Sequence, residues 1–191
     1  SKKITIRDNQ DEILSEVKNS LERKPEYIFI TGGLGPTHDD VTKESLSELF
    51  NQPLIVDKIA YKEMAQKYAS IGKKQIDKNS KKQAMILKNS KPIKNRIGLA
   101  VGFSVESDKS NIIVLPGVPR EIKIMIKEEV CPHFFSTYVS DIYKTIRTFG
   151  ISESSLYGKM EKKIDENLGS FLFSFLPHFN GVDIRIKSSV N

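Results

Sequence analysis

A short apolar run, a glycine-rich turn and a helical pattern follow one another near the start of this chain, and together they constrain its fold most. Residues 27–30 are apolar and predict a buried strand, residues 31–42 read TGGLGPTHDDVT, and apolar residues then recur at helical spacing as far as Phe50. A strand that enters a helix through glycines brings backbone amides to one point, where they can bind an anion. The pattern therefore predicts an α/β fold with a phosphate site at the end of this strand.

The turn itself combines conformational freedom with negative charge. Its glycines can adopt positive φ and let a ligand approach the backbone, while the proline stiffens the turn. The residues that we expect to bind phosphate here are Thr31, Gly32, Gly33, Gly35, Pro36 and Thr37. Thr37 and Asp40 are spaced as in a capping box, so one of them is expected to cap the following helix. The second carboxylate, Asp39, is then available together with Asp40 for a divalent cation that bridges to phosphate.

A second loop has the same position relative to a strand. Pro116, Gly117 and Pro119 follow the apolar residues 111–115 and precede another helical pattern. Ligands of parallel sheets bind beyond the carboxyl ends of the strands, so both loops face one crevice if their strands are adjacent and parallel. The alternatives are structural: an ordinary tight turn at the first loop, and a rigid turn with Pro119 at the first position of a helix at the second.

Strands alternate with helices over the first two thirds of the chain. The strands are predicted at residues 3–7, 27–31, 54–56, 99–105 and 111–115. We expect a mostly parallel sheet with residues 99–115 as an antiparallel exception, an irregular polar segment over 73–97, and a last helix that Pro132 ends. From residue 142 the pattern predicts a strand, a helix and two strands, which form a small α+β unit. The predicted domains are therefore 1–138 and 139–191.

The composition is that of a globular protein. Hydrophobic residues make up 38% of the chain, and no apolar run approaches the roughly 20 residues that span a bilayer. We expect no membrane association and, because Cys131 is the single cysteine, a cytoplasmic protein without an internal disulfide or a cysteine cluster for zinc. The net charge is +6, with basic residues gathered over 73–96. Such a run forms either a solvated face or a rim that attracts phosphate.

The same motifs carry a resemblance to a known family. Residues 31–42 are similar to the signature Thr-Gly-Gly-x-Gly-Pro-Thr-x-Asp-Asp-x-Thr of the molybdopterin-binding domain shared by the MoaB, MogA and CinA proteins. Residues 115–121, LPGVPRE, resemble the Leu-Pro-Gly-x-Pro-x-Glu motif of the CinA branch. Residues 79–103 resemble its middle section, and residues 145–154 resemble the segment that opens its KH-like domain. The chain thus resembles the CinA family over nearly its whole length.

The resemblance implies a fold and an activity. The fold is a three-layer, mostly parallel α/β domain of MoaB/MogA type that lacks its first strand and helix here, followed by a small α+β KH-like domain; in bacterial members a deamidase domain often comes next. The activity is hydrolysis of a pyrophosphate linkage, as in ADP-ribose, by a dimer with Mg²⁺, Mn²⁺ or Co²⁺. Asp40 and Asp39 would be the catalytic, metal-binding residues, and Lys82 and Asn95 would lie at the phosphates.

Two other functions stay open. Molybdopterin binding or adenylylation would use the same turn, although enzymes of the MogA type tend to have a serine where this chain has Val118. An RNA-binding module would suit the basic charge and the KH-like tail. However, residues 141–191 lack the Gly-x-x-Gly loop with which KH domains clamp a nucleic-acid backbone. The expected ligand is therefore a small-molecule nucleotide rather than a nucleic acid.

Overall fold

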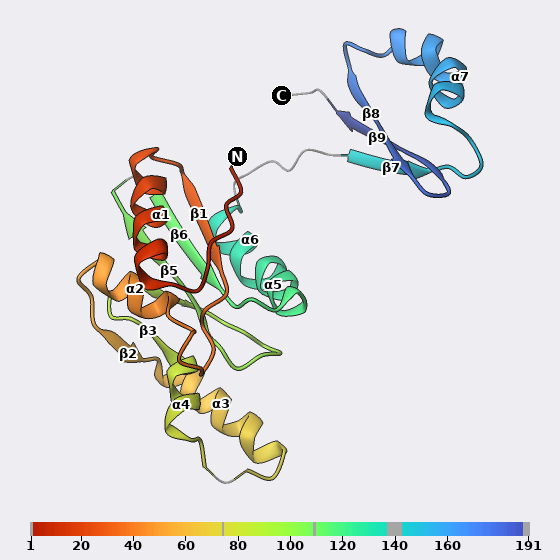
Figure 1. Ribbon diagram of the computed structural model, residues 1–191. Helices are drawn as coiled ribbons and strands as arrows, with labels where there is room; N and C mark the ends of the chain where they lie inside the picture. Colours follow the sequence, from red (N-terminus) through yellow and green to blue (C-terminus); the bar gives the residue numbers. More distant parts are fainter. Residues whose placement is uncertain (1, 74, 109, 137–142, 189–191) are drawn as a thin grey trace. The chain divides into compact units, whose positions relative to one another are not determined.

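The computed structural model describes residues 2–73, 75–108, 110–136 and 143–188 of the chain (Figure 1). The chain divides into two compact units, unit 1 up to Ser136 and unit 2 from Thr137 onward. The predicted domain boundary between residues 138 and 139 lies outside the described residues. Within the ranges described, no helix has the length and apolar character needed to cross a bilayer.

Unit 1 is built on a four-stranded sheet. Its strands are, in spatial order, β1 (Tyr27–Thr31), β6 (Ser110–Leu115), β5 (Gly102–Ser107) and β4 (Lys91–Ile93). β1 pairs with β6 in parallel, whereas β6 with β5 and β5 with β4 are antiparallel. The expected antiparallel pair over 99–115 is confirmed, but the prediction of a mostly parallel sheet is wrong for the described strands. The connections between β4, β5 and β6 are too short for a parallel crossover, which needs a dozen or more residues.

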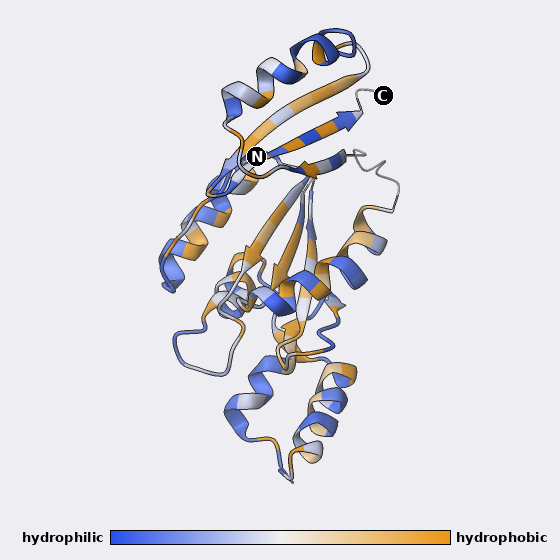
Figure 2. Ribbon diagram, turned by 90° about the vertical axis from the view of Figure 1, so that its right-hand side faces the viewer, coloured by the Kyte–Doolittle hydropathy of each residue, from blue (hydrophilic) through white to orange (hydrophobic). Residues whose placement is uncertain are grey.

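Helices cover both faces of this sheet and give the expected three-layer α/β fold (Figure 1). One layer consists of α1 (Gln10–Glu22) and α2 (Thr42–Leu49), and the other of α5 (Pro119–Met125), the π-helical turn Ile126–Val130 and α6 (Cys131–Phe134). Along β6, side chains alternate between the layers: Ile112 and Val114 belong to the first core, Ile113 and Leu115 to the second. Figure 2 shows mainly hydrophobic strands, with hydrophilic residues on the surrounding helices.

A smaller sub-structure completes unit 1. The antiparallel strands β2 (Leu54–Val56) and β3 (Met85–Leu87) flank α3 (Lys58–Ser70), α4 (Lys78–Lys81) and the 3₁₀ turn Lys82–Ala84. Met64, Tyr68 and Ala84 form a buried cluster among these elements. Most of the segment 73–97 is therefore regular, although its polar composition predicted an irregular chain. Asp57 and Asp77 cap the two helices through the amides of Ala60 and Ser80.

Two further predictions from local pattern are wrong. Residues 3–7 form no strand, and Ile4 and Ile6 are exposed, because alternating residues make a strand only where a paired edge receives them. Pro132 does not end the last helix of unit 1, since the chain stays helical as far as Phe134. Pro132 lies in the first turn of α6, directly after the π-helical turn, where the N–H that it lacks is not required.

Unit 2 has the predicted strand–helix–strand–strand order. β7 (Tyr143–Arg147), β9 (Gly181–Ser188) and β8 (Phe171–His178) form an antiparallel sheet in this spatial order, with α7 (Glu153–Asp165) on one face. Leu156, Val182 and Ile184 are its buried centre, and Ser152 caps α7 by accepting from the amide of Ser155. The unit thus has a small core of its own, as the alternation from residue 142 predicted.

Candidate functional site

The glycine turn leaves β1 with a backbone that only glycine can adopt comfortably. Gly32 and Gly33 have φ of 98° and 66°. A Cβ on Gly33 would lie 2.0 Å from Oγ1 of Thr42, the first residue of α2, so the turn and the helix approach too closely for any other residue. The Thr42 hydroxyl donates to the carbonyl of Gly32 at 3.0 Å. Leu34, which is 1% exposed, anchors the turn in the core.

The second half of the turn is braced by Thr37 and Asp40. The amide and the hydroxyl of Thr37 donate to Oδ2 of Asp40 at 3.0 and 2.5 Å. The predicted capping role is wrong, because the N-cap of α2 is Val41, which makes no side-chain cap. The three-residue spacing of Thr37 and Asp40 closes the turn before the helix instead of capping it.

Both carboxylates of the turn are ionised at neutral pH. The hydroxyl of Thr37 is the main cause that lowers the pKa of Asp39, which lies exposed. Partial burial raises the pKa of Asp40, but the hydrogen bonds from Thr37 and from the Gly35 amide outweigh burial and leave the pKa below its usual value.

The second loop meets the first at the same edge of the sheet. β1 and β6 are parallel neighbours, as the prediction required, and the amide of Gly32 donates to the carbonyl of Leu115 at 3.0 Å. A Cβ on Gly117 would lie 3.4 Å from the Cα of Gly32, so the two loops are in contact. Pro119 occupies the first turn of α5, which confirms the structural reading of this proline. Pro116 lies between Leu115 and Gly117, at the carboxyl end of β6.

Backbone donors gather where these two loops meet. In the described part of the chain, the amides of Gly33, Leu34 and Gly117 donate to no protein acceptor. Unpaired amides on adjacent loops at strand ends are the usual partners of a phosphate oxygen. This arrangement makes the junction of the loops the candidate anion site.

Asn95 belongs to a third loop, which is bonded to the start of α5. Its Nδ2 donates to Oε2 of Glu121 on α5 at 2.7 Å and to the carbonyl of Ala100 at 3.0 Å, and its Oδ1 accepts from the amide of Gly98 at 2.7 Å. Asn95 is 6% exposed, so its polar atoms are committed to holding the loop. The structure shows a connecting role for Asn95, and its contact with phosphate stays a prediction.

Lys82 reaches the glycine turn from the segment before β3. Its ammonium donates to the carbonyl of Asp40, lies 3.5 Å from that of Thr37, and pairs with Oε1 of Glu44 at 3.1 Å. The structure therefore brings Lys82 to the glycine turn, and its contact with phosphate stays a prediction. The ammonium of Lys82 bonds to the glycine turn and to α2, so it stabilises the conformation of the turn.

Sequence reasoning missed Lys43, the neighbour of Glu44 on α2. It is fully buried, and its Nζ donates to the carbonyls of Lys82 and Gln83. Burial lowers the pKa of Lys43 to about 7. A signal existed, because Lys43, Leu46 and Phe50 follow the i, i+3, i+7 spacing of a buried helix face.

Asp39 and Asp40 are suited to a divalent cation whose other ligands are phosphate oxygens. They are too few to bind a cation with protein ligands alone. Among the described residues, no three His, Cys, Asp or Glu side chains gather as metal ligands. Asp40 is committed to Thr37, and Asp39 is exposed. Mg²⁺ is commonly bound by one or two carboxylates plus substrate phosphates, and Asp39 with Asp40 can supply these carboxylate ligands.

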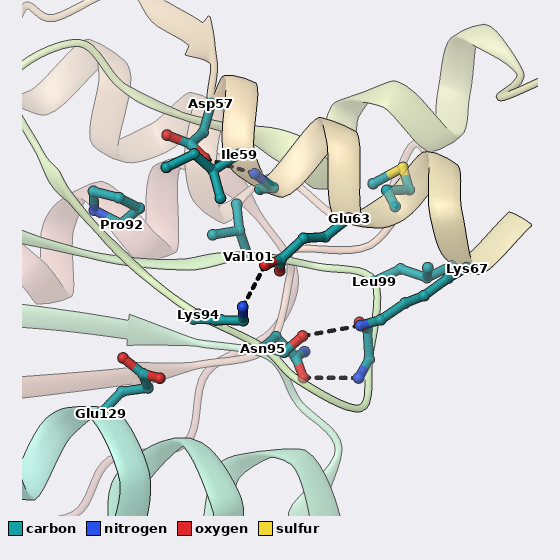
Figure 3. A pocket seen from close by; sticks show the side chains of 13 residues that line it. Asp57, Ile59, Glu63, Lys67, Pro92, Lys94, Asn95, Leu99, Val101 and Glu129 are labelled. Atoms are coloured by element: carbon teal, nitrogen blue, oxygen red, sulfur yellow. Dashed lines mark hydrogen bonds and ion pairs between the residues drawn. The ribbon is translucent and has the colours of Figure 1, made fainter.

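A cavity of about 210 Å³ lies beside the third loop (Figure 3). Ile59, Met64, Leu99 and Val101 contribute apolar walls. The polar groups at its rim bond to the protein: Lys94 pairs with Glu63, and Lys67 donates to the carbonyls of Asn95 and Gly98. The cavity therefore offers apolar surface, while Lys67 holds the loop that carries Asn95.

Comparisons with known proteins place these features in a family context. Residues 1–135 match the family model described as "Probable molybdopterin binding domain". The chain is 36% identical to a "CinA-like protein" of Chlorobium phaeobacteroides and 34% identical to another of Flavobacterium psychrophilum. Each alignment covers 97% of this chain, but 45% and 44% of the relatives, so the chain spans less than half their length.

A solved structure is also similar. The crystal structure of "the protein CinA with unknown function" from Thermoplasma acidophilum is 33% identical in sequence, with a TM-score of 0.57. The match covers 63% of this chain and 69% of that one.

Replacing Gly33 by alanine should damage the turn far more than the same change at Gly117. Gly33→Ala forces a non-glycine residue to positive φ and against Thr42, so we expect a loss of about 2 kcal/mol or more in the free energy of unfolding. The added methyl of Gly117→Ala meets only ordinary contacts, so a change within about 0.5 kcal/mol is expected. Urea unfolding of both variants measures this, and equal losses would contradict the close approach.

The buried lysine should make stability rise with pH above neutrality. Between about pH 7 and the ordinary pKa of 10.5, the unfolded chain carries a proton on Lys43 that the folded chain lacks. The free energy of unfolding therefore gains up to about 1.4 kcal/mol per pH unit from this group, and nothing below pH 7. Lys43→Met should remove this slope. Urea unfolding of both proteins from pH 6 to 10 gives the difference, and parallel curves would refute the assignment.

Proposed function

The chain belongs to the CinA family, and from this membership and the loop geometry we propose that unit 1 binds the phosphates of a nucleotide at the glycine turn and hydrolyses a pyrophosphate linkage, such as that of ADP-ribose, with a divalent cation. The proposal concerns this part of the protein, since the curated relatives are more than twice as long.

The observation that carries the proposal is the group of amides at the junction of the two loops. Gly33 and Leu34 come from the loop after β1, and Gly117 comes from the loop after β6. Several unpaired donors on two adjacent loops suit an anion with several oxygens, because each oxygen can accept separately. A pyrophosphate has such oxygens on two adjacent phosphorus atoms, so it can engage both loops at once.

Side chains of the turn supply the charge that the amides lack. Asp39 and Asp40 are ionised and lie next to the candidate anion site, where alone they would repel phosphate. A divalent cation between these carboxylates and the phosphates would polarise a phosphoryl oxygen and lower the pKa of a bound water. Thr37 orients Asp40 through its amide and hydroxyl, and Lys82 holds the carbonyl side of the same turn.

Molybdopterin binding or adenylylation is the second candidate, and the matching family description favours it. Molybdopterin carries a phosphate group, so the same amides would serve. Val118 stands where MogA-type enzymes tend to have serine, and it is half exposed in the second loop. This position favours the pyrophosphate reading. An RNA ligand has less support, because unit 2 lacks the Gly-x-x-Gly clamp. A dimer and a cytoplasmic location stay predictions.

Turnover of ADP-ribose tests the main proposal. The full-length protein with Mg²⁺, Mn²⁺ or Co²⁺ should release AMP and ribose 5-phosphate, and chelation by EDTA should stop the release. Chromatography with ultraviolet detection measures AMP, and mass spectrometry measures ribose 5-phosphate. If no AMP is formed with any of the three metals while molybdopterin binds in a fluorescence titration, the second candidate replaces the first.

Asp40→Asn should separate the charge of Asp40 from its structural role. The amide oxygen of asparagine can still accept from Thr37, so the turn should keep its shape, whereas the charge for the cation is lost. We expect turnover to fall about 100-fold or more at saturating substrate, with a melting temperature within a few degrees of the parent protein. Unchanged turnover would remove Asp40 from the proposed metal site.

A further inference from the structure

Lys43 is the most unusual side chain of unit 1. Together with Phe103 and Leu46 it is among the largest side chains that are fully buried, although it is a lysine on a helix of eight residues. Burial of an ammonium is costly unless it is hydrogen-bonded, and lysine is almost never fully buried without partners. Its partners therefore indicate what it does for the fold.

The partners of Lys43 are two consecutive backbone carbonyls. Its Nζ lies 2.8 Å from the oxygen of Lys82 and 3.3 Å from that of Gln83. These residues open the 3₁₀ turn Lys82–Ala84, about forty positions further along the chain. Lys43 thus ties the start of α2 to the segment that leads into β3.

The residue next to Lys43 holds the other end of Lys82. Oε1 of Glu44 pairs with the Lys82 ammonium at 3.1 Å, and Oε2 of Glu44 is buried without a hydrogen bond to any described group. The same ammonium donates to the carbonyl of Asp40. Two residues of α2 therefore bind Lys82: Lys43 donates to its backbone carbonyl, and Glu44 pairs with its ammonium. Because the same ammonium donates to the glycine turn, these contacts also restrain the turn.

We propose that Lys43 is a positioning residue for the anion site, acting through Lys82: it fixes the backbone at Lys82 so that the Lys82 ammonium holds the Thr37–Asp40 half of the glycine turn in its binding shape. This rests on the anion-binding part of the proposed function and is independent of hydrolysis.

The charge state of Lys43 is secondary to this role. Burial brings its pKa to about 7, with Glu44 and Asp40 favouring the charged form and Lys82 opposing it. Both the ammonium and the neutral amine carry at least two N–H groups, enough for the two carbonyls. The tie between α2 and the 3₁₀ turn therefore persists on either side of neutral pH.

Methionine is a suitable replacement because it leaves no carbonyl without a partner. The oxygen of Lys82 also accepts from the amide of Met85, and that of Gln83 from the amide of Val101 at 3.0 Å. Methionine fills a similar apolar volume without a buried charge. Lys43→Met should accordingly fold while losing the tie.

A double-mutant cycle tests whether Lys43 acts through Lys82. Inorganic pyrophosphate with Mg²⁺ is the probe, and its Kd is measured by calorimetry for the parent protein, Lys43→Met, Lys82→Met and the double variant. We expect Lys43→Met to weaken binding about tenfold in the parent and hardly at all in the Lys82→Met background. Equal weakening in both backgrounds would overturn the proposal, because it would show a general structural effect.

A matched control and a second readout keep the test decisive. Lys91→Met removes a lysine that pairs with Glu106 on the exposed side of the β4–β5 pair, and it should leave the Kd unchanged. Amide hydrogen exchange over 82–84 should speed up in Lys43→Met and not in Lys91→Met, with or without pyrophosphate. If the parent protein binds no pyrophosphate, the proposed function fails, while the exchange data still decide whether Lys43 holds the segment.

Should Lys43→Met not unfold cooperatively, Lys43→Gln takes its place in the same cycle, since it keeps an amide donor in the site. It should weaken pyrophosphate binding less than Lys82→Met does, again without effect when Lys82 is absent. Unchanged affinity and unchanged exchange in a folded Lys43 variant would overturn the positioning role.

Discussion

The parallel pairing of β1 with β6 is the constraint on which the candidate site depends. The register sets Thr31 opposite Leu115, and one more bond, from the Gly32 amide to the Leu115 carbonyl, extends the pairing into the first loop. Both strands therefore end at the same edge, and their loops meet at Gly32 and Gly117. The helices α2 and α5 start from these loops, so their positions follow from the same pairing.

Hydrogen bonds, rather than apolar packing, hold the exposed part of the glycine turn. Leu34 is buried, but the chain from Thr37 to Asp39 lies at the surface. Hydrogen bonds from Thr37 to Asp40 and from Lys82 to the Asp40 carbonyl therefore determine its shape. The geometry of these hydrogen bonds depends on α2, because its Lys43 and Glu44 bind Lys82. This arrangement requires the amine of Lys43 to be buried, which costs free energy. A binding turn with few apolar contacts gains rigidity in this way.

Much of the fold could be read from local pattern, and the failures have identifiable causes. β1 and the alternation of strands with helices follow from apolar runs and helical spacing, which depend on neighbours in sequence, whereas the three-layer form was an expectation from the family resemblance. The strand expected at residues 3–7 did not form, because a strand also requires a paired edge, which pattern does not specify. Thr37 and Asp40 had the spacing of a capping box, yet their hydrogen bonds closed the turn, since capping depends on which residue precedes the first helical φ and ψ.

The sequence by itself determined the glycine turn, its two carboxylates and its place between a strand and a helix, because each depends on local chain chemistry. It also carried the family resemblance, since motifs are local as well. Only the tertiary structure decided that Gly117 touches Gly32, that Asn95 joins its loop to Glu121, and that Lys43 is buried on the carbonyls of Lys82 and Gln83. These contacts join residues far apart in the chain, and their formation depends on strand order and helix packing rather than on any local pattern.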